Sequence, residues 1–280
     1  MGILEAVLLG IIQGFTEFLP VSSSGHLVLF QRIFGISEPA LFFDTMVHAG
    51  TLAAVFVVLW KDILDILRHP TQALTGFLIL ATLPAVIAAL LFKDAIEKAF
   101  QSGSFLGFAF LLTSLALLIS GILAKRSGNV RGAPGTKPAM DWLDALIIGI
   151  LQAAAIVPGV SRSGFTLSGA LSRGLDRDFA ARFSFLLSIP AILGALVLQL
   201  KDLAGGSVIQ AGDIAAGTAS GGIGAGAILA GSLSAAVVGF FSVKLMLKII
   251  RERSLTGFAV YTAVLGALVL IDQYGTHFFF

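Results

Sequence analysis

The sequence predicts an all-α polytopic membrane protein, in which six transmembrane helices and two re-entrant helix-break-helix hairpins form an inverted repeat. Three observations support this fold class. Of the 280 residues, 57% are hydrophobic and 12% are charged, about half the charged share of a soluble domain. Six apolar stretches reach or approach the length of a bilayer crossing. Two more are interrupted by a proline beside serine and glycine.

The six predicted crossings are the apolar stretches 42–60, 76–92, 104–123, 183–200, 222–243 and 256–272. Stretches 3–30 and 142–171 are also long enough to span, but Pro20 and Pro158 interrupt them. We interpret each as a helix, a break and a second helix that dips into the membrane and returns. Lipid cannot satisfy free backbone N–H and C=O groups, so such breaks have to be buried or line a wet cavity. Two breaks therefore predict a site.

The two breaks resemble each other in sequence. Val-Ser-Ser-Ser-Gly at 21–25 is matched by Val-Ser-Arg-Ser-Gly at 160–164, which lies 139 residues later. The same offset relates two pairs upstream of the breaks, Gly10 with Gly149 and Gln13 with Gln152. The pattern indicates an internal repeat.

Each half of the chain, 1–123 and 142–275, contains one hairpin and three crossings. Because three is odd, the second half enters the membrane with the opposite orientation, which makes the repeat inverted. We therefore expect a single membrane domain, 1–280, whose halves are joined by the basic cytoplasmic loop 124–141. For residues 204–236, rich in Gly and Ala, close helix packing is expected, with a flexible linker equally open for 204–221.

The charges in the loops orient the chain, because Lys and Arg collect on the cytoplasmic side. One face has the loops 61–75, 124–141, 172–181 and 244–255, with twelve Lys or Arg residues. The other face has four, Arg32, Lys93, Lys98 and Lys201. Both termini are therefore expected outside the cytoplasm. The net charge of +2 is too small to indicate nucleic-acid binding, and the absence of Cys excludes disulfides and cysteine nucleophiles.

The first break carries candidate catalytic groups. Gln13 and Glu17 are four residues apart, so they share one face of a helix. A carboxylate at membrane depth is costly, which favours a functional role for Glu17 over the alternative of a solvated helix end. His26 could act as base, acid or nucleophile, although a lone His is more often structural.

The segment after Pro20 is suited to binding an anion. Ser22, Ser23, Ser24 and Gly25 stand at an expected helix N-terminus, where free N–H groups and the helix dipole favour negative charge. A serine-rich N-cap without further function is the alternative.

The second break adds a positive charge to two serines and a glycine. Ser161, Arg162, Ser163 and Gly164 follow Pro158, and a guanidinium in the membrane requires an anionic partner such as phosphate. If the repeat brings the breaks together, one cavity is expected to hold a phosphoryl-transfer set: Glu17, Ser23, His26 and Arg162.

Two other pairs have helical spacing. Asp44 and His48, at the start of the first crossing, are secondary candidates for the same cavity or for a metal, with interfacial capping as the alternative. Asp178 and Arg182 are expected to form an ordinary ion pair at a helix end.

The stretch Gln-Gly-Phe-Thr-Glu-Phe-Leu-Pro-Val-Ser-Ser-Ser-Gly-His at 13–26, with Pro-Gly-Val-Ser-Arg-Ser-Gly at 158–164, closely resembles the undecaprenyl-diphosphatase (bacitracin-resistance) family of bacterial membrane enzymes. The likeness covers nearly the whole chain, including 182–190. It implies hydrolysis of undecaprenyl pyrophosphate to the monophosphate carrier lipid and inorganic phosphate, which recycles the carrier for peptidoglycan synthesis at the inner membrane. It also implies a divalent cation, Mg²⁺ or Ca²⁺.

The resemblance implies roles for individual residues. Glu17 matches the second acidic residue of the motif and is the candidate metal ligand; Ser23 and His26 match proposed nucleophile or base residues; Arg162 matches the phosphate-binding arginine. Some members have a glutamate in place of Gln13, so a two-carboxylate metal site does not carry over directly. The expected phosphate-binding groups around them are Gln13, Ser22, Ser24, Gly25, Ser161, Ser163 and Gly164.

Two other functions stay open at this point. Inverted repeats with broken helices also build secondary transporters, and a lipid flippase would use the same anion site. The expected partners are the polyprenyl pyrophosphate and membrane lipid, with no nucleic acid, and a homodimer is a candidate assembly.

Overall fold

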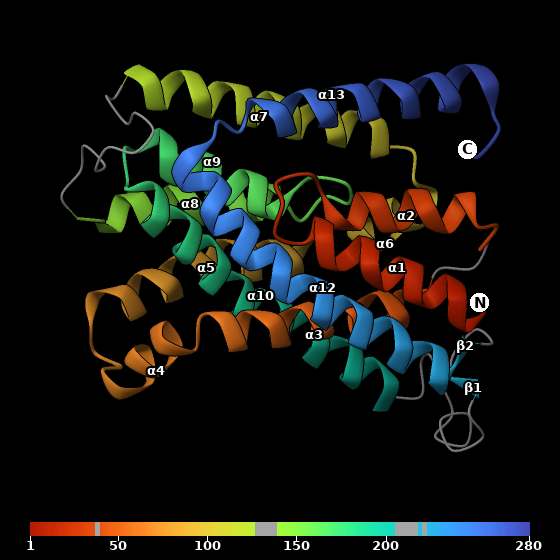
Figure 1. Cartoon of the computed structure of the whole chain (residues 1–280), viewed down its shortest axis with the longest axis horizontal. Helices are drawn as coiled ribbons and strands as arrows, with labels where there is room; N and C mark the ends of the chain where they lie inside the picture. Colours follow the sequence, from red (N-terminus) through yellow and green to blue (C-terminus); the bar gives the residue numbers. More distant parts are fainter. Residues whose placement is uncertain (37–39, 127–138, 205–217, 220–222) are drawn as a thin grey trace.

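The computed structural model describes residues 1–36, 40–126, 139–204, 218–219 and 223–280, and almost all of this part is helical (Figure 1). The helices of the first half are α1 (Ile3–Thr16), α2 (Ser23–Ile33), α3 (Leu41–Val58), α4 (Trp60–Arg68), α5 (Ala73–Leu91), α6 (Lys93–Ser102) and α7 (Leu106–Arg126). Those of the second half are α8 (Trp142–Ala154), α9 (Arg162–Ser172), α10 (Arg177–Ala204), α12 (Ala225–Glu252), α13 (Thr256–Ile271) and the π-helix η1 (Asp272–Thr276).

In the part of the chain that the structure describes, six helices are long and apolar enough to cross a membrane, in the places that the sequence predicts. They are α3, α5, α7, α10, α12 and α13, the last continuing into η1. The apolar window of α5 is only 11% buried inside the protein. An apolar helix with so little protein cover has to face lipid, as expected of a multi-pass membrane protein.

Both interrupted stretches are broken where the sequence predicts. α1 ends before Pro20 and α2 begins at Ser23, while Pro158 lies between α8 and α9. Proline lacks a backbone N–H and disfavours helix in the preceding residue, so each apolar run divides into two short helices.

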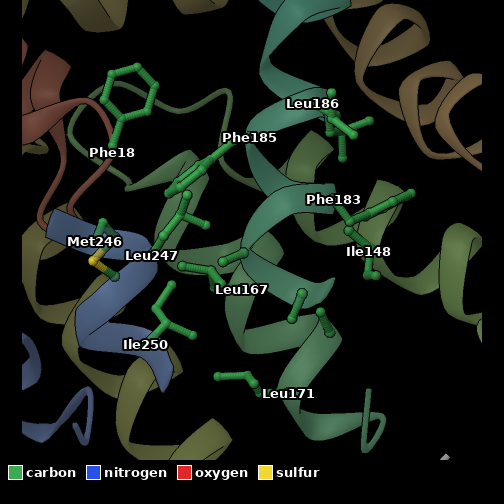
Figure 2. Packing of buried hydrophobic residues seen from close by; sticks show 14 of the residues in the cluster. Phe18, Ile148, Leu167, Leu171, Phe183, Phe185, Leu186, Met246, Leu247 and Ile250 are labelled. Carbon is green, nitrogen blue, oxygen red and sulfur yellow. The ribbon is translucent and has the colours of Figure 1, made fainter. Parts of the chain in front are cut away.

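The short helices pack on long helices from the other half of the chain. α1 lies along α12, which also packs on α3, and α8 lies along α5. α7 and α13 lie side by side at one edge (Figure 1). The largest core cluster joins α9, α10 and α12 (Figure 2); it includes Leu167, Leu171, Phe183, Phe185, Met246 and Ile250.

One backbone approach between helices requires glycine on both sides. A Cβ on Gly10 of α1 would lie 2.1 Å from the carbonyl oxygen of Gly231 in α12. Small residues allow helix backbones to approach closely in lipid. The expected close packing in the Gly- and Ala-rich segment is therefore observed at Gly231.

An ion-pair network joins α4, α10 and α12. Arg182 pairs with Asp178 at 3.0 Å, as predicted, and also with Asp62 of α4 at 2.8 Å. Arg251 of α12 reaches Asp178 at 2.6 Å. The ion pair of Asp178 and Arg182 thus links α10 to α4 and α12.

Two predicted segments fall largely outside the described residues. Of the loop 124–141, residues 127–138 are not described, and neither are 205–217 and 220–221 of the 204–221 segment. Before α12, a two-residue strand β1 (Thr218–Ala219) pairs antiparallel with β2 (Ile223–Gly224), with Thr218 opposite Gly224. The sequence did not predict this pair.

Candidate active site

Glu17 is the centre of the first break. It follows α1 directly and is 5% exposed, so its carboxylate requires partners. Gln13, one helical turn earlier, donates from Nε2 to Glu17 Oε2 at 2.8 Å. Ser23 at the start of α2 donates its hydroxyl to the same oxygen at 2.6 Å. The shared helix face predicted for Gln13 and Glu17 is therefore confirmed.

The helices after the breaks have matching N-caps. Ser22 Oγ accepts a hydrogen bond from the backbone N–H of Gly25 at 3.2 Å, and Ser161 Oγ accepts one from Gly164 at 3.0 Å. Each cap satisfies one of the free N–H groups of a first turn. The backbone differs, because Ser22 has φ of 73° whereas Ser161 has φ of −74°.

The two breaks lie against each other, as the repeat predicts. Arg162, the first residue of α9, forms an ion pair with Glu17 through Nη2. The backbone N–H of Gly159 donates to Ser24 Oγ at 3.2 Å. Ser163 donates its hydroxyl to the carbonyl oxygen of Leu19 at 3.1 Å. Residues more than 130 positions apart thus form one polar centre.

A cavity of about 400 Å³ opens beside this centre. Its polar wall contains Glu17, Ser23, Ser24, Asp44, Thr45, His48, Lys93, Ser161, Arg162 and Ser163. The rest of the wall is apolar and comes from Leu27, Leu41, Ala89, Ile96, Ala155, Ile156, Val160, Ala191, Ile192, Ala195 and Leu198. The cavity suits a molecule with an anionic head and an apolar tail.

The secondary candidates Asp44 and His48 belong to the same wall. His48 Nε2 lies 3.4 Å from Glu17 Oε2, and its Nδ1 donates to the Asp44 carbonyl oxygen at 2.6 Å. Gln31 of α2 donates to Asp44 Oδ1 at 2.6 Å. α3 therefore adds a second carboxylate and an imidazole to the centre.

His26 does not line the cavity, although the sequence predicts it there. His26 is 3% exposed, and its ring lies against Phe110 of α7 and Tyr261 of α13. It follows Ser23 by three residues, but the ring turns toward the α7–α13 pair. Four predicted phosphate-binding residues are also absent from the cavity wall: Gln13, Ser22, Gly25 and Gly164.

The residues of the cavity can hold a divalent cation only if the substrate supplies some of its ligands. Among the described residues, no group of three or more His, Asp or Glu side chains is placed to hold a metal. Glu17 is already bonded to Arg162, Ser23 and Gln13. Mg²⁺ commonly uses one or two protein carboxylates together with substrate phosphates. Glu17 and Asp44, which both line the cavity, fit that arrangement.

Four residues of this region were not predicted for the site from the sequence, and one of them is Gln31, which bonds to Asp44. Thr45 and Lys93 line the cavity, and Tyr261 contacts His26. Thr45 lies one residue after Asp44, so helical spacing offered a weak signal. Lys93 and Tyr261 come from helices whose packing no local pattern specifies.

Comparison with known proteins finds relatives that share one name, undecaprenyl-diphosphatase. An undecaprenyl-diphosphatase of Carboxydothermus hydrogenoformans is 44% identical over 273 residues, which cover 98% of both chains. Undecaprenyl-diphosphatase 4 of Bacillus thuringiensis subsp. konkukian is 43% identical over 98% of both chains. An undecaprenyl-diphosphatase of Methanosphaera stadtmanae is 39% identical, covering 97% of this chain and 98% of its own. The model of the family "Bacitracin resistance protein BacA" matches residues 6–268, so the chain belongs to that family.

Proposed function

We propose that this protein is an undecaprenyl-diphosphatase, which hydrolyses undecaprenyl pyrophosphate to undecaprenyl phosphate and inorganic phosphate. The observation that carries the proposal is the cavity, which joins the centre of Glu17, Ser23 and Arg162 to a long apolar wall. An isoprenoid pyrophosphate has the matching chemistry, with an anionic head and an apolar chain. The names of the relatives agree with this substrate.

The head group is held by Arg162 and by the N-termini of α2 and α9. A guanidinium has five N–H donors, and Arg162 directs Nη2 to Glu17, which leaves other donors for phosphate oxygens. Free N–H groups and the dipoles of two helix starts add further positive potential. Ser161 and Ser163 line the cavity beside them.

Ser23 is the nucleophile that the geometry favours. Its hydroxyl lines the cavity and donates to Glu17, so the carboxylate is placed to take the proton. In this mechanism Ser23 Oγ bonds to the terminal phosphorus while the bond to the bridging oxygen breaks, which releases undecaprenyl phosphate. Water then cleaves the phosphoserine and releases phosphate. An activated water that attacks directly is the alternative.

A divalent cation, Mg²⁺ or Ca²⁺, belongs to the proposal. When bound, it neutralises part of the pyrophosphate charge. Glu17 and Asp44 are the carboxylates that would hold it, and Gln31 fixes the orientation of Asp44 through its hydrogen bond of 2.6 Å.

We also propose that the two halves form an inverted repeat with re-entrant hairpins. Supporting this, α1 packs on α12 of the other half and α8 packs on α5 in the same way. At the matching positions, Gly10 contacts Gly231 and Gly149 contacts Ala81. Irregular backbone at both breaks lies against protein and a cavity, as membrane depth requires.

We propose that the protein lies in the inner membrane with both termini on the side away from the cytoplasm. α4 lies within the basic loop 61–75, and the chain termini lie at the other end of the molecule (Figure 1). α3 leads into α4 and α5 leaves it, so the first turn of α3 and the last of α5 lie away from α4. Leu41 and Ala89, from those turns, line the cavity. The cavity therefore opens toward the face of the termini.

The transporter and flippase alternatives receive no support from the comparisons, whose relatives are named for hydrolysis. A homodimer remains part of the proposal, and light scattering of the purified protein in detergent would test it.

The direct test is phosphate release from undecaprenyl pyrophosphate by purified protein in detergent, with Mg²⁺, with Ca²⁺ and with a chelator. Arg162→Ala is expected to lower kcat/KM by about 100-fold or more, since a donor aimed at phosphate charge is lost. Arg251→Ala is the matched control, because Arg251 pairs with Asp178 outside the cavity. A folded wild type that releases no phosphate under any cation would contradict the proposal, as would an unaffected Arg162→Ala.

A further inference from the structure

The N-cap of α2 has an unusual backbone. Ser22 has φ of 73° and ψ of 93°, a region that L residues with a side chain rarely occupy. Such conformations persist where surrounding contacts hold them, often near functional groups. The next residue is Ser23, whose hydroxyl faces Glu17. Any shift of the Ser22 peptide would therefore move the proposed nucleophile.

His26 bonds directly to this strained peptide. Its Nδ1 lies 2.7 Å from the carbonyl oxygen of Ser22, and its Nε2 lies 2.7 Å from the hydroxyl of Tyr261. A carbonyl oxygen only accepts, so Nδ1 carries the proton. In the neutral ring Nε2 is then an acceptor, and the Tyr261 hydroxyl donates to it. Both nitrogens are thus occupied.

The rings around His26 hold it in this orientation. Tyr261 stacks on it at 5.7 Å with 9° between the planes, and Phe110 meets it edge-on at 5.4 Å. His26 is 3% exposed and does not line the cavity. It is therefore poorly placed to exchange a proton with substrate.

The second break serves as an internal comparison. The residue 139 positions after His26 is Phe165, which has no ring nitrogen. Ser161, the matching cap, has an ordinary φ of −74°. The imidazole thus occurs after the first break, where the cap residue Ser22 has a strained backbone. The second break, where the cap residue Ser161 has an ordinary backbone, has no imidazole at the matching position.

We infer that His26 and Tyr261 form a positioning pair, in which His26 holds the Ser22 peptide by donating from Nδ1 and Tyr261 fixes the tautomer of His26. Neither residue exchanges a proton with the substrate. The expected effect of this pair on the rate rests on the proposed function. The tautomer of His26 with the proton on Nδ1, which the pair requires, can be observed in the protein without substrate.

Substitutions that mimic one nitrogen at a time test the pair. An amide in His26→Asn can replace the Nδ1–H donor, whereas His26→Gln places its amide nearer Nε2 and His26→Ala has neither. We expect kcat within about tenfold of wild type for His26→Asn, and about 100-fold lower for His26→Gln and His26→Ala. Tyr261→Phe should lower kcat by about tenfold with KM nearly unchanged.

The pH profile separates positioning from proton transfer. A general base leaves a limb in the profile of kcat, and its replacement removes that limb. We expect His26→Asn to keep the wild-type limbs. An Asn variant as inactive as His26→Ala, or one that loses a limb, would overturn the inference while wild-type phosphate release still supports the proposed function.

A measurement independent of activity is the ¹⁵N NMR spectrum of histidine-labelled protein, with the His26 signals assigned by their absence in His26→Asn. Protonated Nδ1 and unprotonated Nε2 are expected at neutral pH, with the Nε2 signal shifted in Tyr261→Phe. The opposite tautomer, or a doubly protonated ring, would refute the pair even in a preparation that releases no phosphate.

Discussion

Substitution of Gly10 by alanine tests how closely the packing of α1 controls the active site. Gly10 faces Gly231 of α12, and an added Cβ would lie 2.1 Å from its carbonyl oxygen. Ordinary van der Waals contact begins at 3.4 Å. The backbone of α1 fixes the position of the added Cβ, and the oxygen belongs to the backbone of α12. Because neither atom can rotate away, the helices have to separate by about 1 Å.

This displacement has two calculable effects. Overpacking a tight contact costs typically about 1–3 kcal/mol of stability, so the melting temperature of Gly10→Ala should fall. The same shift moves the end of α1, where Gln13 bonds to Glu17 at 2.8 Å. A misplacement of about 1 Å in a catalytic site can lower the rate about 100-fold. The loss of activity should therefore exceed what the loss of stability explains.

The assay compares Gly10 with two other glycines in apolar helices. Gly194 lies in α10, and a Cβ placed on it meets nothing within 4 Å. Gly194→Ala should keep both the melting temperature in detergent and kcat for phosphate release. Gly149→Ala, where the Cβ would lie 2.7 Å from the carbonyl oxygen of Ala81, should show a milder defect than Gly10→Ala. If Gly10→Ala behaves like Gly194→Ala, α1 and α12 do not approach as described.

Two other predictions concern the cavity wall. Asp44→Asn should raise the Mg²⁺ concentration for half-maximal phosphate release, measured by metal titration, because an amide is a weaker ligand for a hard cation than a carboxylate; an unchanged titration curve would remove Asp44 from the cation site. Ala195→Leu should narrow the cavity at its apolar wall and raise KM for undecaprenyl pyrophosphate more than for farnesyl pyrophosphate, whose isoprenoid chain is shorter. Equal effects on both substrates would show that the isoprenoid chain does not bind along this wall.

The helices and both breaks were predictable because they depend on local chemistry. Apolar length sets a crossing. Pro20 and Pro158 each stand beside serine and glycine and mark the breaks, whereas Pro84 and Pro190 lie inside α5 and α10. The meeting of the breaks was also predictable, since a repeat with equivalent halves tends to place equivalent segments together. The sequence placed Glu17 and Arg162 in one expected cavity, but it assigned phosphate as the partner of Arg162, so their ion pair is known only from the structure.

The position of His26 was not predictable from its neighbours. It lies three positions after Ser23, and the sequence alone allows the ring to face the cavity or to face away. Its direction depends on Phe110 and Tyr261, which lie far along the chain on α7 and α13. The contact of His48 with Glu17 at 3.4 Å has the same origin, because the packing of α3 decides it.

The ion pair of Glu17 and Arg162 shows why a site this polar can form among apolar helices before substrate arrives. A buried carboxylate or guanidinium alone would be strongly destabilising. In the pair, the two charges neutralise each other, and Glu17 also accepts hydrogen bonds from Ser23 and Gln13. The side chain of Arg162 remains 20% exposed, whereas that of Glu17 is 3% exposed. An arriving phosphate therefore meets the positive partner first, and the carboxylate behind it stays bonded to the serine that it is proposed to activate.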